Sequence, residues 1–229
     1  MIRNSVYFFV ALGLFAIAGF WPSYFSRAHQ AANLRVYLHD FVMGLWCVML
    51  IAQAYLIRTD HRALHHLLGK FSYVLAPVIV VATLSFMHFR LREAGNAPPA
   101  ELLYFLYVQL SLLLLFVFCY GMAIVHRHTP SVHAGYMVCT ALTLVDPVFA
   151  RLLSNHLGVT PPLMQVITYG IIDLILLWLI VWGRRQPRPV KIFPVVLAVF
   201  VAVQIPTLLI SQTAAWRAVA HWYGALPFP

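Results

Sequence analysis

Charged residues are scarce in this sequence. Only 9% of its 229 residues are charged, with 6 Asp and Glu against 15 Lys and Arg. Hydrophobic residues make up 62% of the chain, and its mean hydropathy is +0.85. This composition excludes an ordinary soluble domain, so we expect an integral membrane protein.

The sequence also lacks the motifs of several classes of protein. The three cysteines, Cys47, Cys119 and Cys139, all lie in apolar runs, which argues against a disulfide framework. The sequence has no Cys-x-x-Cys-His motif for covalent haem. In its last apolar run the one lysine, Lys191, is the first residue, so no lysine lies within the span to form the Schiff base of a retinal photoreceptor. The net charge of +9 is spread over many loops, which favours anionic lipid headgroups as partners and gives no support for nucleic acid.

The apolar residues gather in seven runs of roughly 17 to 25 residues, the length that crosses a bilayer as a helix. The runs lie near 5–25, 36–57, 71–89, 101–125, 132–153, 162–183 and 191–213. A signal peptide is the competing interpretation of the first run, but Gly19-Phe-Trp-Pro22 is a poor cleavage site. We therefore expect one all-α domain over residues 1–229, an integral membrane bundle of about seven transmembrane helices.

The distribution of basic residues predicts the orientation of this bundle. Nine Lys and Arg fall on the side of the N-terminus and six on the other side. Short loops rich in Lys and Arg stay inside, so the N-terminus is expected inside and the C-terminus outside.

Eleven histidines are many for so apolar a chain. In the predicted topology His39 and His88 lie toward the outer face, while His65, His66 and His133 lie toward the inner face. Imidazoles from two helices at equal depth can bind the iron of a b-type haem from both sides. The sequence thus predicts an outer haem b site with His39 and His88, and an inner one with His133 and either His65 or His66.

Sulfur-containing neighbours support a copper site as an alternative. His39, Met43 and Cys47 are spaced by four and share one stripe of a helix, and His133 and Met137 have the same spacing. Copper prefers such mixtures of imidazole and sulfur ligands.

A zinc site for hydrolysis is a further alternative, with His39, His88 and Asp146 as ligands. Seven-helix enzymes of this kind usually have a His-x-x-x-His pair in the last span, which this sequence lacks. For four histidines of the inner face the competing expectation is that they lie beside arginines and face water or lipid headgroups. These are His61, His66, His126 and His128.

Four further polar residues within the apolar runs need partners on other helices. Gln53 marks a buried face of the second run. Asp146 and Arg151 are five residues apart, so they pair directly only if Pro147 distorts the helix between them. Asp173 lies near the middle of the sixth run, where an acid must be hydrogen-bonded or protonated.

The order of these residues follows a recognisable pattern. His39, Gln53 and Arg58 precede His65-His-Leu-Leu-Gly-Lys70, and His126-Arg-His-Thr-Pro-Ser-Val-His133, Met137 and Asp146-Pro-Val-Phe-Ala-Arg151 follow. This pattern resembles a widespread bacterial family of multi-spanning membrane proteins of unknown function, although His66 stands where an arginine is usual. The resemblance covers about residues 37–155. It implies a bacterial inner membrane location and a role for His39, Gln53, His65, Gly69, His133, Pro147 and Arg151.

The layout is also similar in outline to membrane diheme cytochromes b. We therefore expect a haem- or metal-binding redox protein or redox subunit in the lipid bilayer, with a membrane redox partner or a quinone. The alternative is a non-enzymatic membrane subunit or a proton-linked carrier of small solutes, which would use Asp173 and the inner histidines.

Overall fold

The computed structural model describes residues 4–27, 33–95, 97–185, 191–211 and 213–227, and every regular element in these ranges is a helix. The α-helices are α1 (Ser5–Phe20), α2 (Leu34–Arg58), α3 (Arg62–Ala94), α4 (Ala100–Val125), α5 (Pro130–Leu157), α6 (Leu163–Arg184), α7 (Ile192–Gln204), α8 (Thr207–Ile210) and α9 (Ala214–Ala225). A short 3-10 helix, η2, spans Phe25–Arg27.

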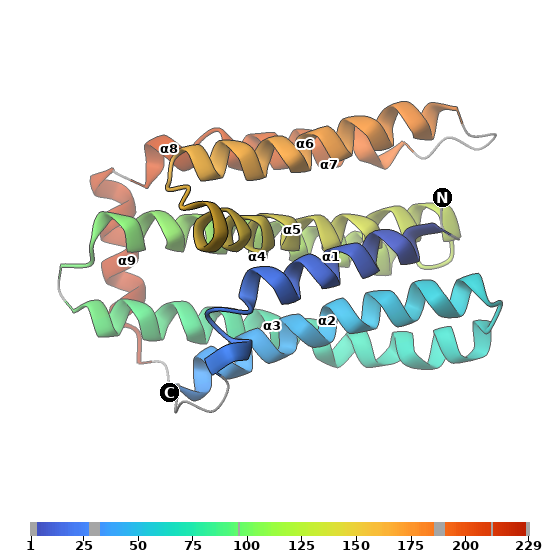
Figure 1. Cartoon of the computed structure of the whole chain (residues 1–229), viewed down its shortest axis with the longest axis horizontal. Coiled ribbons are helices and arrows are strands. Elements are labelled where there is room, and N and C mark those ends of the chain that lie inside the picture. The colour runs from blue at the N-terminus through green and yellow to red at the C-terminus, as the bar shows by residue number, and fades with distance from the viewer. Residues whose placement is uncertain (1–3, 28–32, 96, 186–190, 212, 228–229) are drawn as a thin grey trace.

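Helices α1 to α7 run along the long axis of the molecule and alternate in direction (Figure 1). The pair α2 and α3 forms one layer, α4 and α5 form the next with α1 packed beside them, and α6 and α7 form the third. We call the end where α1 begins the N-terminal end. The opposite end, which α9 crosses, is called the α9 end.

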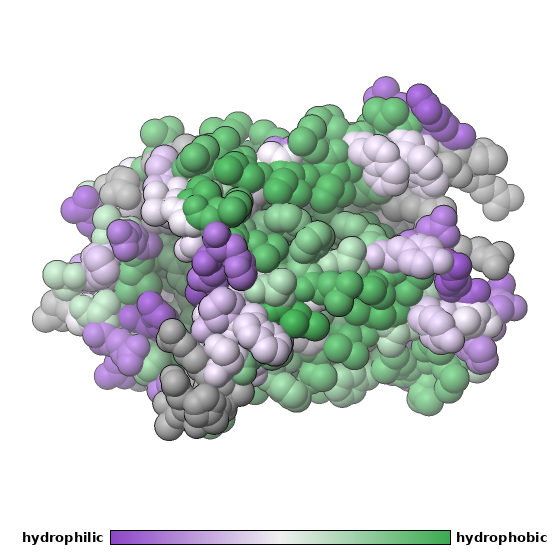
Figure 2. All heavy atoms as spheres, viewed as in Figure 1, coloured by the Kyte–Doolittle hydropathy of each residue, from purple (hydrophilic) through white to green (hydrophobic). Residues whose placement is uncertain are grey.

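Five helices, α2 to α6, are long and apolar enough to cross a membrane. Helices α1 and α7 are equally apolar but shorter. Figure 2 shows hydrophobic residues around the middle of the bundle, and hydrophilic residues at its two ends. This distribution is that of a multi-pass membrane protein, because apolar side chains face the hydrocarbon and charged ones reach the interfaces.

Helix α3 is longer than the sequence analysis predicted. It begins at Arg62 instead of near residue 71, so His65 and His66 lie at its start. The turn between α2 and α3 is confined to residues 59–61, where Asp60 has a φ of 59°, a conformation that Asp tolerates better than most residues. Gly69 faces α2, where a Cβ would lie in ordinary contact with Gln53, 3.4 Å from its Nε2.

The last predicted run, 191–213, is not one continuous helix. Helix α7 ends at Gln204, and Pro206 precedes the single turn of α8. Helix α9 then packs across the ends of α3 and α4, where Trp216 Nε1 donates to the Leu103 carbonyl at 2.9 Å. The Tyr223 hydroxyl donates to the Leu84 carbonyl at 2.6 Å.

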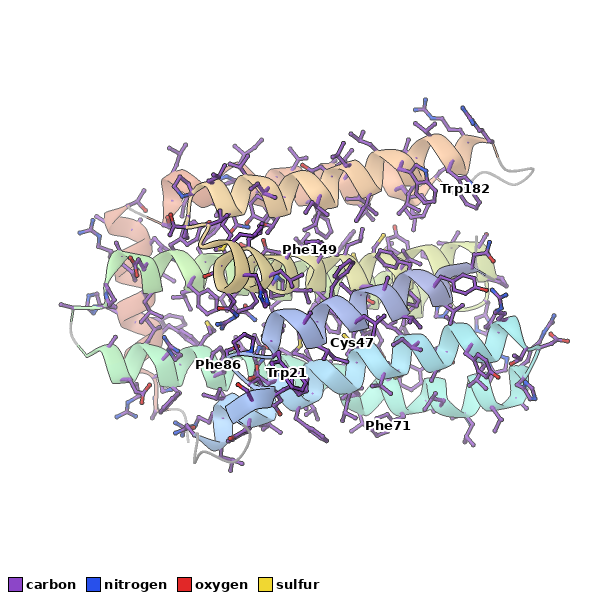
Figure 3. All side chains as sticks on the ribbon, viewed as in Figure 1. Trp21, Cys47, Phe71, Phe86, Phe149 and Trp182 are labelled. Carbon is purple, nitrogen blue, oxygen red and sulfur yellow. The ribbon has the colours of Figure 1, made fainter. Side chains whose placement is uncertain are left out.

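Helix α1 is fixed against α5 by close contacts. A Cβ on Gly19 would lie 2.9 Å from the Val148 carbonyl oxygen, so only glycine allows this approach. Asn155 Nδ2 donates to the Gly19 carbonyl at 3.0 Å. The rings of Phe15 and Phe149 pack 5.3 Å apart, and Figure 3 labels Phe149 on α5. This docking makes α1 one wall of the cavity described below.

Candidate functional site

A cavity of about 830 Å³ lies among helices α1 to α6, in the half of the bundle nearer the α9 end. Its walls are mostly apolar, and we call it the large cavity. Its polar and charged lining residues are Ser23, Tyr24, His39, Asp40, Cys47, Arg90, Tyr104, Gln109, Asp146, Arg151 and Gln165. Polar groups are costly inside an apolar bundle, and here many of them surround one cavity. The large cavity is therefore the candidate functional site.

Asp146 on α5 is the most deeply buried acid in the described chain, at 3% exposure. Its Oδ1 accepts hydrogen bonds from Gln165 Nε2 and Thr168 Oγ1 on α6, each at 2.5 Å. The Tyr104 hydroxyl of α4 donates to Gln165 Oε1 at 2.7 Å. No described residue donates to Oδ2, and the carboxyl group lines the large cavity. Asp146 is thus held rigidly, with one oxygen left for an occupant.

His39 on α2 is held from two sides. Its Nδ1 lies 3.2 Å from the Thr83 hydroxyl of α3, and its ring stacks on Phe86 with centroids 4.9 Å apart. A hydrogen bond at one ring nitrogen fixes the orientation of the imidazole. Among the described residues Nε2 has no partner, and His39 lines the large cavity. This nitrogen is therefore placed to hydrogen-bond or ligate an occupant.

Opposite charges meet at the same cavity. Asp40 follows His39 on α2 and lies within electrostatic range of Arg151 on α5. The Arg151 guanidinium lies 5.6 Å from the centre of the Phe20 ring on α1. Arg151 therefore finds its partners on α1 and α2, and Asp146 finds its own on α6. The direct Asp146–Arg151 pair, which required a distortion at Pro147, is not how the structure satisfies either residue.

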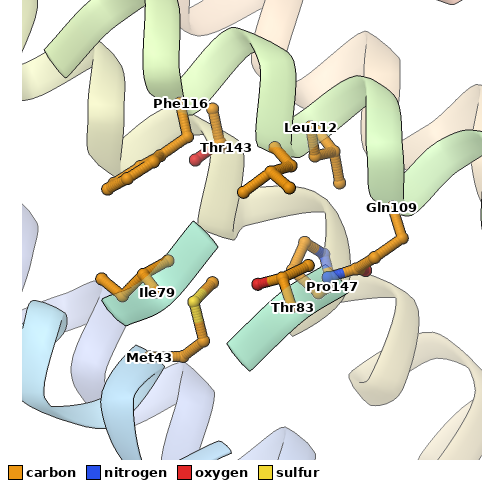
Figure 4. Close-up of a pocket in the computed structure, with 9 residues that line it drawn as sticks. Met43, Ile79, Thr83, Gln109, Leu112, Phe116, Thr143 and Pro147 are labelled. Carbon is orange, nitrogen blue, oxygen red and sulfur yellow. The ribbon is translucent and has the colours of Figure 1, made fainter. Parts of the chain in front are cut away.

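A much smaller cavity, about 20 Å³, lies between residues of α2, α3, α4 and α5 (Figure 4). It shares Met43, Gln109 and Pro147 with the large cavity and is also lined by Thr83 and Thr143. Because Pro147 has no N–H, the Thr143 carbonyl lacks its usual helical donor. A space of this size with several polar groups suits one water molecule.

The two histidines predicted to bind an outer haem are held by different neighbours. His88 Nε2 bonds to the Leu226 carbonyl at 2.9 Å, and its ring packs edge-on against Tyr223 at 5.7 Å. His88 therefore lies under the C-terminal segment, whereas His39 faces the large cavity. The two histidines of the predicted pair therefore do not share an environment.

The predicted inner residues lie near the N-terminal end. Gln53 Nε2 donates to the His65 carbonyl at 3.2 Å, while Gln53 Oε1 and His65 Nδ1 are buried without a described partner. His65 is within electrostatic range of His133, whose Nδ1 bonds to the Ala123 carbonyl at 2.8 Å. The structure thus brings Gln53, His65 and His133 to one region of the bundle.

The predicted sulfur ligands separate in the same way. His39, Met43 and Cys47 line the large cavity along one stripe of α2, whereas Met137 does not line it. In the described part of the chain, no three His, Cys, Asp or Glu side chains converge as a metal site would require. Asp173 is satisfied by Gln204 of α7, which donates from Nε2 to Oδ1 at 3.1 Å.

Gln165, Thr168 and Tyr104 were not identified from the sequence. Gln165 and Thr168 are polar residues three apart on an apolar helix, and this spacing was the available signal for one shared face. Tyr104 gave no comparable signal. No protein-family model, no curated protein and no solved structure matches the chain.

Proposed function

We propose that the protein is a membrane-embedded redox protein, or a subunit of a redox complex, that binds a small amphipathic molecule in the large cavity. One observation carries this proposal: His39 and Asp146, from two different helices, present unpartnered polar atoms to one cavity of about 830 Å³. Small-molecule sites are typically of this size, mostly apolar, with a few fixed polar groups.

The proposal includes a membrane topology of seven spans. Helices α1 and α7, extended by α8, would complete the set begun by the five long helices. The alternating directions of α1 to α7 support this count (Figure 1). Arg58, Arg62, Arg127 and Arg184 lie near the N-terminal end, which would be the inner face under the positive-inside rule. The bacterial inner membrane and the family resemblance rest on the sequence pattern alone.

A haem or a copper ion is proposed for the N-terminal end, where the donor set fits better than at His39 and His88. His133 can donate its Nδ1–H to Ala123, which leaves a lone pair on Nε2, as in many metal-binding histidines. His65 has a buried Nδ1 with no described partner. A bound haem or copper would supply one-electron transfer. Zinc at His39, His88 and Asp146 is less favoured, because these residues turn to separate partners.

The carrier remains the alternative predicted from the sequence. Asp173 lines neither of the two cavities described above, and it is bonded to Gln204. The geometry around Asp173 therefore offers no path or binding space comparable to the large cavity.

The test is to identify what the purified protein holds. The protein is extracted in mild detergent, and the bound molecules are recovered with organic solvent and analysed by mass spectrometry. We expect one amphipathic compound at close to stoichiometric amount, lost in H39A and D146L but retained in D173N. Absorption spectra before and after dithionite, with metal analysis, test the haem or copper on the same sample. An equal lipid background in all four proteins would overturn the proposed cavity function.

A further inference from the structure

We infer that the occupant of the large cavity is an uncharged quinone-type ring on an isoprenoid tail, which enters sideways from the lipid between α1 and α2. This inference rests on the proposed function, and it specifies the class of ligand and the route. It is carried by three features: the opening of the cavity, the charge of its wall, and its size.

The large cavity opens on the side of the bundle. Its lining includes Leu14 and Ile17 of α1 and Phe41 and Val48 of α2, and all four side chains are exposed on the surface of the protein. We call these four residues the portal. Large apolar side chains exposed on membrane-spanning helices face hydrocarbon. The opening therefore leads into the lipid and not into water.

The portal lies where α1 and α2 leave space. Gly44 of α2 lines the large cavity, and a Cβ built on it would meet nothing within 4 Å in the described chain. Gly13, further along α1, is closer to α2, because a Cβ there would lie 3.4 Å from Ile51 Cδ1. Helix α1 is meanwhile held to α5 through Gly19. The space beside Gly44 thus lies between α1 and α2.

The charges at the cavity favour a neutral ligand. The charged lining residues are Asp40, Asp146, Arg90 and Arg151, so the lining has two acids and two bases. A phospholipid headgroup would add an uncompensated phosphate to this balanced set, at a high cost in a low-dielectric site. A ring with two oxygens needs only hydrogen bonds, and His39 Nε2 and the Asp146 carboxyl are available for them. A carbonyl oxygen of the ring would accept from His39 Nε2–H, while Nδ1 of the same imidazole accepts from the Thr83 hydroxyl. A hydroxyl of the reduced ring would donate to the Asp146 carboxylate.

The size of the cavity favours a ring with its tail extending out. A volume of about 830 Å³ holds a substituted ring and the first part of a chain. The rest of a long isoprenoid tail must leave through the portal, where Leu14 and Val48 offer it apolar contacts. The ring then lies among the polar residues while the tail stays in the hydrocarbon.

The experiment compares two tritiated quinones on the full-length protein in nanodiscs of phosphatidylcholine. One is a benzoquinone with a ten-unit isoprenoid tail, and the other is the same ring without a tail. The portal variant is V48W, and its control is V81W on α3. Val48 and Val81 are 61% and 60% exposed, but only Val48 lines the cavity. We expect V48W to slow association of the long-tailed quinone by roughly tenfold and to slow the tail-less ring less, because that ring leaves no tail in the portal. V81W should change neither.

The outcomes separate the inference from the proposed function. Equal association of the long-tailed quinone with V48W and V81W would overturn the sideways route. If neither quinone binds the unmodified protein, but a phospholipid is recovered from it and lost in H39A, the quinone class is wrong and the cavity function stands. If no compound depends on His39 or Asp146, the proposed function itself fails. A second variant, G44L, fills the cavity and should abolish binding of both quinones, whereas G121L on α4 should not.

Discussion

The side-chain amide of Gln165 on α6 donates to Oδ1 of Asp146 on α5, and so joins two neighbouring helices at the wall of the large cavity. The same amide accepts from the Tyr104 hydroxyl through its oxygen, which adds α4 to the network. Three helices are thereby held in register around one carboxyl group. In a buried network of this kind, the loss of one member leaves its partners without a hydrogen bond in a low-dielectric surrounding.

Removing Gln165 should therefore destabilise the bundle. In Q165L the Tyr104 hydroxyl loses its acceptor, and the Asp146 carboxyl keeps only the bond from Thr168. A buried polar group left unpaired costs about 1–3 kcal/mol. Thermal unfolding in detergent should show a clear fall in Tm. The control is E93Q, because Glu93 is exposed at the end of α3 and no described residue bonds to it. A Q165L protein as stable as E93Q would show that the network contributes nothing.

Loosening His39 should weaken ligand binding without unfolding the protein. T83V removes the hydroxyl that holds His39 Nδ1 at 3.2 Å, so the imidazole loses its fixed orientation. A lost hydrogen bond of about 1 kcal/mol corresponds to roughly a fivefold weaker affinity. Binding titrations with the compound identified by mass spectrometry measure this. T160V, at an exposed position before α6, is the matched control and should bind normally.

The contact between α1 and α5 should tolerate no side chain at Gly19. G19A places a methyl group 2.9 Å from the Val148 carbonyl oxygen, so α1 must shift away from α5 at a cost of about 1–3 kcal/mol. The large cavity would lose part of its wall, and both Tm and ligand affinity should fall. G121A is the comparison, since a Cβ there meets nothing within 4 Å of it in the described chain. Identical melting of the two variants would contradict the close approach.

The docking of α9 should weaken at high pH. Burial raises the pKa of Tyr223 from its usual 10.0 to about 12, because the folded protein disfavours the charged phenolate. The stabilisation is fully present below pH 10 and is lost as the pH rises toward 12. Y223F also removes the hydrogen bond to Leu84, so it should lower Tm near neutral pH and reduce the loss between pH 10 and 12. Tm measured against pH for both proteins checks this. Parallel curves would contradict the role of Tyr223.

Variants of His133 and His88 should distinguish a histidine that binds a cofactor from one that holds the C-terminal segment. If a haem or copper is bound at the N-terminal end, H133A should abolish its absorption, because His133 is oriented there by Ala123. H88A should keep the absorption and instead lower Tm, because His88 bonds to the Leu226 carbonyl. Loss of the spectrum in H88A but not in H133A would reverse this assignment.

Much of the architecture follows from local properties of the chain. Hydropathy and length predicted an all-α membrane protein, and the five long helices agree with five of the seven predicted runs. The start of α3 was missed because Arg62 to Lys70 is polar enough to look like a turn. In fact these residues form helix well, and a single left-handed residue, Asp60, reverses the chain.

The sequence by itself determined which polar residues lie inside apolar helices, since composition and periodicity are properties of each segment alone. It therefore predicted that Asp146, Arg151 and Asp173 need partners on other helices unless local distortion or protonation intervenes. The identity of those partners depends on how each helix is rotated about its axis and which neighbour it meets. Only the tertiary structure decided that Asp146 meets Gln165, that His88 turns to Leu226, and that His39 faces a cavity. These rotations are set by packing between helices distant in sequence, such as Gly19 against Val148, which no single segment encodes.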